Sequence, residues 1–152
     1  MSLPPISNSN MDCLFCRIVV RGIPAEVLYE GERVIAILDR YPIHRGHALI
    51  LPKGHFTNLL QLPADNFHEI MHATQTVAEA IVRSLDLKGF NVFSNNGAIA
   101  GQSIFHFHIH VTPRFPDDMV RFAHGQKTYA DGEMAQYGAR IRSCIQSNSH
   151  KE

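Results

Sequence analysis

The stretch SIFHFHIHVTPRF constrains this chain most, because it places His106, His108 and His110 at every second position. In an extended strand the three imidazoles would share one face, while Phe107 and Ile109 would lie on the other. A rise of about 3.3 Å per residue separates neighbouring histidines by about 6.6 Å and the outer pair by about 13 Å. This spacing disfavours a single three-histidine metal cage. It favours a row of imidazoles along an elongated ligand, with one end of the row available to a metal.

The loop before these histidines, NNGAIAGQS, carries residue types that suit a phosphate group. Gly97 and Gly101 allow the backbone to approach a ligand closely. Asn95, Gln102 and Ser103 supply amide and hydroxyl groups that can donate hydrogen bonds to phosphate oxygens. A glycine-containing loop more often only turns the chain. Because this one ends two residues before the histidine row, it predicts an anion site beside the row.

Hydrophobic patterning predicts an α+β domain with a five-stranded, mostly antiparallel sheet, one long helix and a shorter C-terminal helix. Residues 13–22 resemble a short helical turn. Apolar residues at spacings of three and four predict the long helix within residues 62–89, and a weaker pattern predicts a helix over 131–146. Short β-rich runs bounded by turn residues predict strands at 26–30, 33–39, 46–52, 90–95 and 105–114.

Length and composition exclude several classes of protein. A chain of 152 residues suits one domain, which we expect over residues 12–148, with flexible tails at 1–11 and 149–152. Equal numbers of basic and acidic residues, 14 each, argue against binding to nucleic acid or to a membrane surface. The chain has no apolar run of about 20 residues and no secretory signal pattern. Three cysteines without a disulfide framework fit a reduced, cytoplasmic setting.

Cys13 and Cys16 form a C-x-x-C motif, and the third cysteine, Cys144, leaves an odd count without a disulfide framework. The pair is compatible with an ordinary buried pair, a redox pair or half of a zinc site. A redox pair would be expected in a thioredoxin-like βαβ context, which the strand order does not predict. A closed structural zinc site would require two more ligands.

The segment GQSIFHFHIHVTPR resembles the signature of the histidine triad (HIT) family, His-φ-His-φ-His-φ-φ, in which φ is apolar. The similarity extends from about Cys13 to Arg114. The segments CLFCRIVVRGIPAEVLYE, AILDRYPIHRGHALILPKGH and NNGAIAGQS follow in the order usual for the family. Thr112 departs mildly from the pattern, because it occupies the last apolar position. The resemblance implies a HIT-like fold.

The resemblance also implies a nucleotide hydrolase or nucleotidyl transferase that cleaves at the α-phosphate of a purine nucleotide. The substrate would be a nucleoside phosphoramidate or a dinucleoside polyphosphate, and His108 would carry a covalent nucleotidyl intermediate. A neutral imidazole is nucleophilic at pH 7, and we expect Nδ1 of His108 to donate to a backbone carbonyl. His106, His110 and His47 would complete the catalytic set. The alternative is a nucleotide-binding regulatory or protein-interaction module whose catalysis is incidental.

The resemblance assigns binding roles to further residues. Asp39 would bind the ribose, and His47 would lie beside the phosphate site. The alternatives are that Asp39 caps a turn and that His47 is a surface histidine of a strand. The expected phosphate contacts are Asn95, Gln102, Ser103 and His110. The expected base contacts are Phe15, Ile18, Ile23 and Leu38, residue types that are more often plain core.

Zinc-containing relatives join a C-x-x-C pair to two histidines at comparable places. By that resemblance, we expect structural zinc at Cys13, Cys16, His55 and His106, where it would anchor the N-terminal segment rather than activate water. The family also implies a symmetric homodimer. The apolar stripe of the long helix is compatible with such a dimer, and equally with covering the protomer's own sheet.

Overall fold

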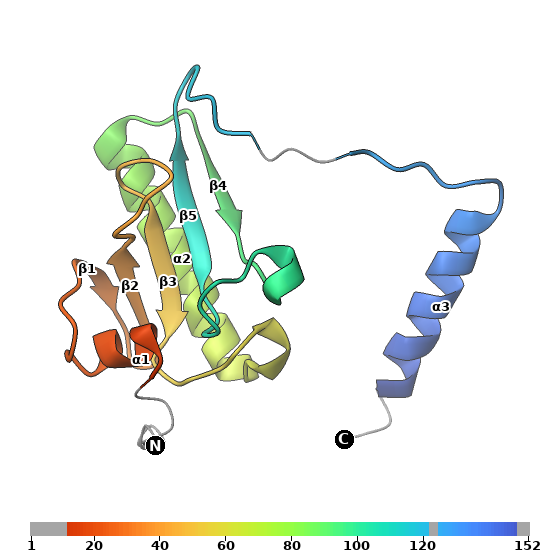
Figure 1. Ribbon diagram of the computed structural model, residues 1–152, viewed down its shortest axis with the longest axis horizontal. Helices are drawn as coiled ribbons and strands as arrows, with labels where there is room; N and C mark the ends of the chain where they lie inside the picture. Colours follow the sequence, from red (N-terminus) through yellow and green to blue (C-terminus); the bar gives the residue numbers. More distant parts are fainter. Residues whose placement is uncertain (1–11, 122–124, 149–152) are drawn as a thin grey trace. The chain divides into compact units, whose positions relative to one another are not determined.

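The computed structural model describes residues 12–121 and 125–148, so both expected tails, 1–11 and 149–152, lie outside the described residues. The chain divides into two compact units, Met1–Met119 and Val120–Glu152, and each is described by itself. The first unit contains a sheet and two α-helices, and the second contains α3, Glu133–Asn148 (Figure 1). Within the described residues, no helix is both long and apolar enough to cross a bilayer.

The sheet has five strands, and each strand pairs antiparallel with its neighbours in the order β1-β2-β3-β5-β4. This confirms the predicted α+β class. Because β3 lies beside β5, the turn that leads into β3 comes close to the histidine row. The strands are β1 Val27–Glu30, β2 Val34–Leu38, β3 Ala48–Pro52, β4 Gly89–Phe93 and β5 Ile109–Arg114.

The long helix α2, Ala64–Leu85, follows Pro63 and ends at Asp86, whose φ of 48° lies in the left-handed region. This confirms the long helix predicted from the apolar spacing. The short helix α1, Leu14–Val19, matches the predicted helical turn. The 3-10 turns η2, Leu59–Gln61, and η3, Ala98–Ala100, were not predicted, since three residues are too few for a periodic pattern.

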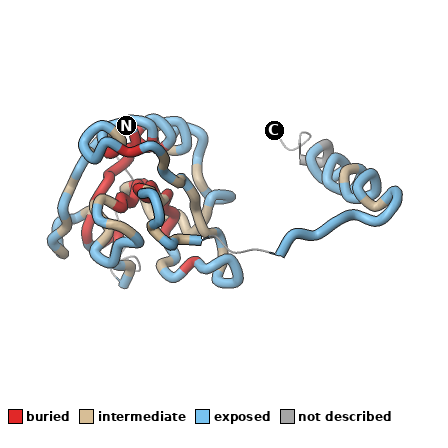
Figure 2. Tube along the Cα trace, turned by 90° about the horizontal axis from the view of Figure 1, so that it is seen from above, coloured by how far each residue is buried: buried red, intermediate tan, exposed pale blue. Residues whose placement is uncertain are grey.

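The sheet buries both of its faces, because alternate residues of β2 and β3 pack in opposite directions. Val34, Ala36, Ala48 and Ile50 belong to the core cluster that contains the α2 residues Ile70, Ala73 and Val77. Ile35, Ile37, Leu49 and Leu51 belong to a second cluster with Phe15 and Ile18 of α1. Figure 2 shows the buried segments gathered inside this unit. The fold therefore fixes α1 on the face opposite to α2.

The predicted strand over residues 105–114 was too long, since β5 begins only at Ile109. The Phe107 N–H donates to the carbonyl of Phe56 at 2.6 Å, and residues 104–106 form a bend rather than ladder pairs. The predicted alternation of faces is nevertheless present. Phe107 and Ile109 lie in the core cluster with α2, while the rings of His106 and His108 contact Phe15 of α1 on the other face. Only His110 of the triad lies within the strand.

Candidate active site and metal centre

His108 has one ring nitrogen fixed by the backbone. Its Nδ1 atom lies 2.7 Å from the carbonyl oxygen of His106. Since a carbonyl oxygen only accepts, Nδ1 carries the proton and Nε2 keeps its lone pair in the neutral ring. Phe15 packs against the ring at a centroid distance of 5.1 Å, edge to face. The expected hydrogen bond of Nδ1 is therefore present, and it leaves Nε2 as the nucleophilic nitrogen.

His47 and His110 are hydrogen-bonded to each other, and their hydrogen bonds determine which nitrogen of each ring carries the proton. The backbone N–H of Ile43 donates to Nδ1 of His47 at 3.1 Å, so the proton of neutral His47 lies on Nε2. That Nε2 atom is 2.9 Å from Nδ1 of His110 and donates to it. The proton of His110 consequently lies on Nε2, where it can be donated to a ligand.

A cavity of about 850 Å³ opens beside these histidines. Its size falls in the range of small-molecule sites, and most of its lining is apolar. Ser103, His108 and His110 contribute polar groups to the lining. The residues expected to contact a nucleoside all line it: Phe15, Ile18, Ile23, Leu38 and Asp39. The structure therefore brings together the predicted nucleophile His108, the predicted phosphate contacts Ser103 and His110, and the predicted base pocket.

Burial determines the charge of the imidazoles. It lowers the pKa of His108, while the bond to the His106 carbonyl and the charge of Asp39 oppose this shift. Burial, together with the neighbouring His108 and His47, lowers the pKa of His110 to about 4. Burial likewise lowers the pKa of His47, against the charge of Asp39. All three rings are consequently neutral at pH 7, as the tautomer assignment requires.

Asn95 and Gln102 lie outside the lining of this cavity. The amide of Gln102 donates to the carbonyl of Thr57 at 2.6 Å, and its Oε1 accepts from the Gly97 N–H at 2.8 Å. Asn95 Nδ2 lies 3.4 Å from the carbonyl of Gly101. In this structure both amides brace the loop that precedes the triad.

A separate cluster lies at the other end of the triad and contains the four predicted metal ligands: Cys13, Cys16, His55 and His106. Their ligand atoms all lie within 4.8 Å of one another. Nδ1 of His106 is 3.5 Å from each sulfur, and Nδ1 of His55 is 3.3 Å from the Cys16 sulfur. Zn–S and Zn–N bonds at a tetrahedral angle give a sulfur to nitrogen separation of about 3.6 Å. The residues therefore fit a tetrahedral zinc ion.

The orientation of His106 supports the same fit. Its Nε2 atom lies 2.8 Å from the carbonyl of Pro52, so Nε2 donates and the lone pair of Nδ1 faces the two sulfurs. Burial lowers the pKa of His106 to about 4, which favours the neutral ring that binds metals. Burial and the neighbouring Cys13 raise the pKa of the Cys16 thiol to about 12, so metal binding would release a proton from this sulfur.

Two contacts of the site were missed in the sequence. Phe93 stacks on the ring of His110 at 4.5 Å and 8°, and the two residues are register partners in β4 and β5. Correct pairing of the last two strands would have predicted this contact. The carbonyl of Pro52, by contrast, carries no signal in the sequence, because any residue type offers the same group.

The fold and the site define an α+β protein in which two histidines of the triad, His108 and His110, line a mostly apolar cavity. The HIT domain family matches residues 20–117. The chain therefore belongs to the histidine triad family, as its motifs predicted.

Two curated relatives illustrate the range of the family. The protein Hit of Bacillus subtilis is 38% identical over 134 residues, which cover 88% of this chain and 92% of the relative. The adenylylsulfatase HINT3 of Arabidopsis thaliana is 41% identical over 109 residues, covering 72% of this chain and 55% of the relative.

Two solved structures share the fold. A histidine triad nucleotide-binding protein from Candida albicans is 27% identical, with a TM-score of 0.81 over 89% of this chain and 98% of its own. A zinc-bound histidine triad family protein from Mycobacterium smegmatis is 34% identical, with a TM-score of 0.70 over 89% of this chain and 99% of its own.

Proposed function

We propose that the protein is a nucleotide hydrolase or nucleotidyl transferase that acts at the α-phosphate of a purine nucleotide. The substrate is a nucleoside phosphoramidate or a dinucleoside polyphosphate, and hydrolysis releases the nucleoside monophosphate. One observation carries the proposal. The bond from Nδ1 of His108 to the carbonyl of His106 leaves the lone pair of Nε2 for attack, in a ring that lines the cavity. The names of the Arabidopsis adenylylsulfatase and the Candida nucleotide-binding protein support a nucleotide as the ligand.

The reaction proceeds in two displacements. Nε2 of His108 attacks phosphorus, the nitrogen–phosphorus bond forms, and the leaving group departs with the electron pair of the broken bond. Water then attacks the same phosphorus, the nitrogen–phosphorus bond breaks, and the imidazole departs with its electron pair restored. The proton that this water gives up to the solvent balances the one that the leaving group takes up. The proton of His108 stays on Nδ1 throughout, donated to the His106 carbonyl, and this hydrogen bond stabilises the positive charge that develops on the ring.

The pair formed by His47 and His110 stabilises the phosphoryl group. Nε2–H of His110 donates a hydrogen bond to a phosphate oxygen and stabilises its negative charge. Nε2–H of His47 donates in turn to Nδ1 of His110 at 2.9 Å. Ser103 lines the cavity and adds a hydroxyl donor. Asn95 and Gln102 contribute through the loop that they brace, and a direct bond from either amide to the phosphate requires that loop to rearrange on binding.

The nucleoside lies in the apolar part of the cavity. Phe15 and Ile18 are buried and belong to the core cluster of α1, so the base pocket is preformed. Asp39 holds the ribose hydroxyls. One oxygen of its carboxylate accepts from the Tyr41 N–H at 2.9 Å, and the other lies 3.6 Å from Nδ1 of His47. The ribose site and the phosphate site therefore share one turn of the chain.

The Cys13, Cys16, His55 and His106 cluster binds zinc in a structural role. The fit of the four ligands and the zinc-bound Mycobacterium structure support this assignment. Four protein ligands would complete the tetrahedral shell of the ion and leave no position for a reacting water. Zinc would anchor α1, and thereby the base pocket, to the first histidine of the triad.

The assembly and compartment are further parts of the proposal. A homodimer is supported by β4, an edge strand whose Phe90 and Val92 are 43% and 44% exposed. The balanced charge supports a small nucleotide, rather than nucleic acid, as the ligand. The C-x-x-C pair in the reduced form supports a cytoplasmic location.

Hydrolysis assays test the activity. Wild type, His108→Ala and the control His72→Ala, which alters an exposed histidine of α2, are incubated with adenosine phosphoramidate and with diadenosine polyphosphates. We expect AMP release by wild type and the control, and a loss of at least about 1000-fold in His108→Ala. Equal turnover by His108→Ala would refute the nucleophile. No turnover of either substrate class by wild type would favour a binding module.

A further inference from the structure

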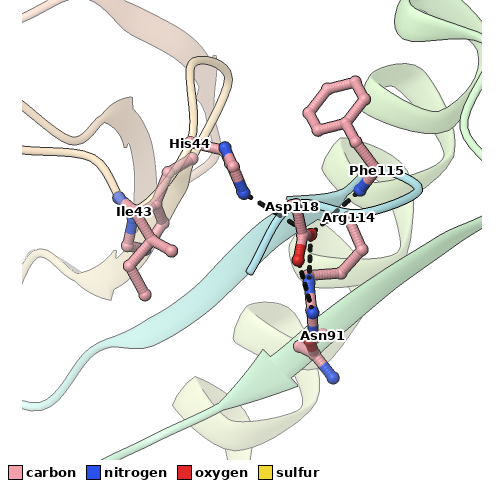
Figure 3. Close-up of polar contacts among 7 residues, drawn as sticks. Ile43, His44, Asn91, Arg114, Phe115 and Asp118 are labelled. Atoms are coloured by element: carbon pink, nitrogen blue, oxygen red, sulfur yellow. Dashed lines mark hydrogen bonds and ion pairs between the residues drawn. The ribbon is translucent and has the colours of Figure 1, made fainter. Parts of the chain in front are cut away.

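Asp118 lies where the chain folds back after β5 (Figure 3). Its side chain is 4% exposed, and it accepts from Arg114 twice, from Nε at 2.6 Å and from Nη2 at 2.9 Å. The backbone N–H of Phe115 donates to the same carboxylate at 3.0 Å. Arg114 ends β5 and also donates to Asn91 of β4 at 2.7 Å. The carboxylate is thereby fixed to the strand that carries His110.

The same carboxylate also contacts the turn before β3, through His44 (Figure 3). Nε2 of His44 is buried and lies 3.4 Å from Oδ2 of Asp118. The two groups are not aligned for a hydrogen bond, so they meet in a close polar contact. The ring of Phe115 packs edge to face on His44 at 5.4 Å. Phe115 and Asp118, which follow β5, therefore both contact the turn from Ile43 to His47 through His44.

This turn determines the state of His47. The carbonyl of His44 accepts from the backbone N–H of His47 at 2.9 Å. The N–H of the preceding residue, Ile43, is the donor that places the proton of His47 on Nε2. Displacement of His44 would disturb both bonds at once. It would then weaken the contact of His47 with His110.

The backbone around Asp118 is strained. Asp117 and Met119, on either side of it, both have a φ of 58°, in the left-handed region that non-glycine residues rarely adopt. Such conformations persist where surrounding contacts over-determine them, and they cluster at functional sites. The buried carboxylate between them supplies those contacts.

We propose that Asp118 is a positioning residue for the reaction, which holds His44 and so orients the His47–His110 pair toward the phosphoryl group. This inference rests on the proposed function. Asp118 is not one of the described residues that line the cavity. It therefore acts through His47 and does not contact the substrate. Asp118 is therefore distinct from the residues that resemblance to the family assigns to the site.

A double-mutant cycle tests the connection. Asp118→Ala should lower kcat about 10-fold and change KM by less than about two-fold, because the residues of the base pocket lie outside the turn from Ile43 to His47. In a His47→Asn background, Asp118→Ala should change kcat by less than about two-fold, since the residue through which it acts is gone. Glu79→Ala, which removes an exposed carboxylate of α2, is the control. An equal loss in both backgrounds, or no loss in wild type, would overturn the proposal.

Long-range proton–nitrogen NMR of the histidine rings tests the same claim without turnover. Wild type should show His47 with its proton on Nε2, and Asp118→Ala should show a mixture of tautomers or a ring in exchange. Asp118→Asn, which keeps an acceptor for Arg114 but loses the charge, serves where the alanine variant does not fold. An unchanged His47 signal in the folded variant overturns the proposal. Because the spectra need no substrate, failure of the proposed activity and failure of this inference are distinguishable.

Discussion

The carbonyl oxygen of His106 accepts a hydrogen bond from Nδ1 of His108 at 2.7 Å. The side chain of His106 meanwhile faces the Cys13 and Cys16 sulfurs, 3.5 Å from each. One residue therefore gives its ring to the candidate metal centre and its backbone to the candidate nucleophile. His106 therefore links the candidate metal centre to the candidate nucleophile, through its ring on one side and its carbonyl on the other. None of the four candidate metal ligands is proposed to contact the phosphate.

Removal of one metal ligand should release zinc and destabilise the fold. We expect one zinc per wild-type chain by native mass spectrometry, and none in Cys16→Ala, because this sulfur is fully buried within the cluster. The melting temperature should fall by several degrees, in line with a loss of about 2 kcal/mol or more. Cys144→Ser, at an exposed position of α3, should change neither value. Wild type free of metal, with a melting temperature that chelators leave unchanged, would contradict the site.

Acid should destabilise the protein through His110. The folded pKa of His110 is lowered to about 4 by burial, while the unfolded ring titrates near 6.5, so between these values the unfolded chain binds more protons. Its contribution is fully present above pH 6.5 and is lost as pH falls toward 4. Urea unfolding at pH 7 and pH 4.5 should differ by about 1 to 2 kcal/mol from this residue after solvent screening is allowed for.

The variant His110→Asn isolates that contribution. It should unfold with a smaller difference between pH 7 and pH 4.5 than wild type does. If both proteins lose the same free energy over this interval, His110 is not a source of the acid sensitivity.

Gly97 should tolerate no side chain. Its φ of 93° and ψ of 152° are essentially confined to glycine, and its N–H holds Gln102 at 2.8 Å. Gly97→Ala should lower the free energy of unfolding by about 1 to 3 kcal/mol and raise KM, because the loop before Ser103 shifts. Gly89→Ala is the matched control, since open space surrounds that position. Equal stability of the two variants, measured by urea unfolding, would show that the loop does not depend on this conformation.

The sequence predicted most of the sheet, because buried β2 and β3 and the periodic α2 carry strong patterns. The alternation also predicted a row of imidazoles along an elongated ligand with one end available to a metal, since strand spacing separates the outer rings. The sequence did not predict features that depend on a single hydrogen bond of the backbone. The start of β5 depends on the carbonyl of Phe56, and the tautomer of His47 depends on the N–H of Ile43. Backbone groups of this kind are common to every residue type, so no pattern reveals them.

The proposed function depends on a covalent bond between Nε2 of His108 and phosphorus. We would mix wild type with an adenylated substrate, denature it at alkaline pH because the phosphorus–nitrogen bond is labile in acid, and measure intact mass and fragment masses. The account predicts a fraction of the chains carrying one nucleotidyl group on His108, and none in His108→Ala. Steady turnover by wild type with no nucleotidyl group at residue 108 on any time scale of mixing would contradict it.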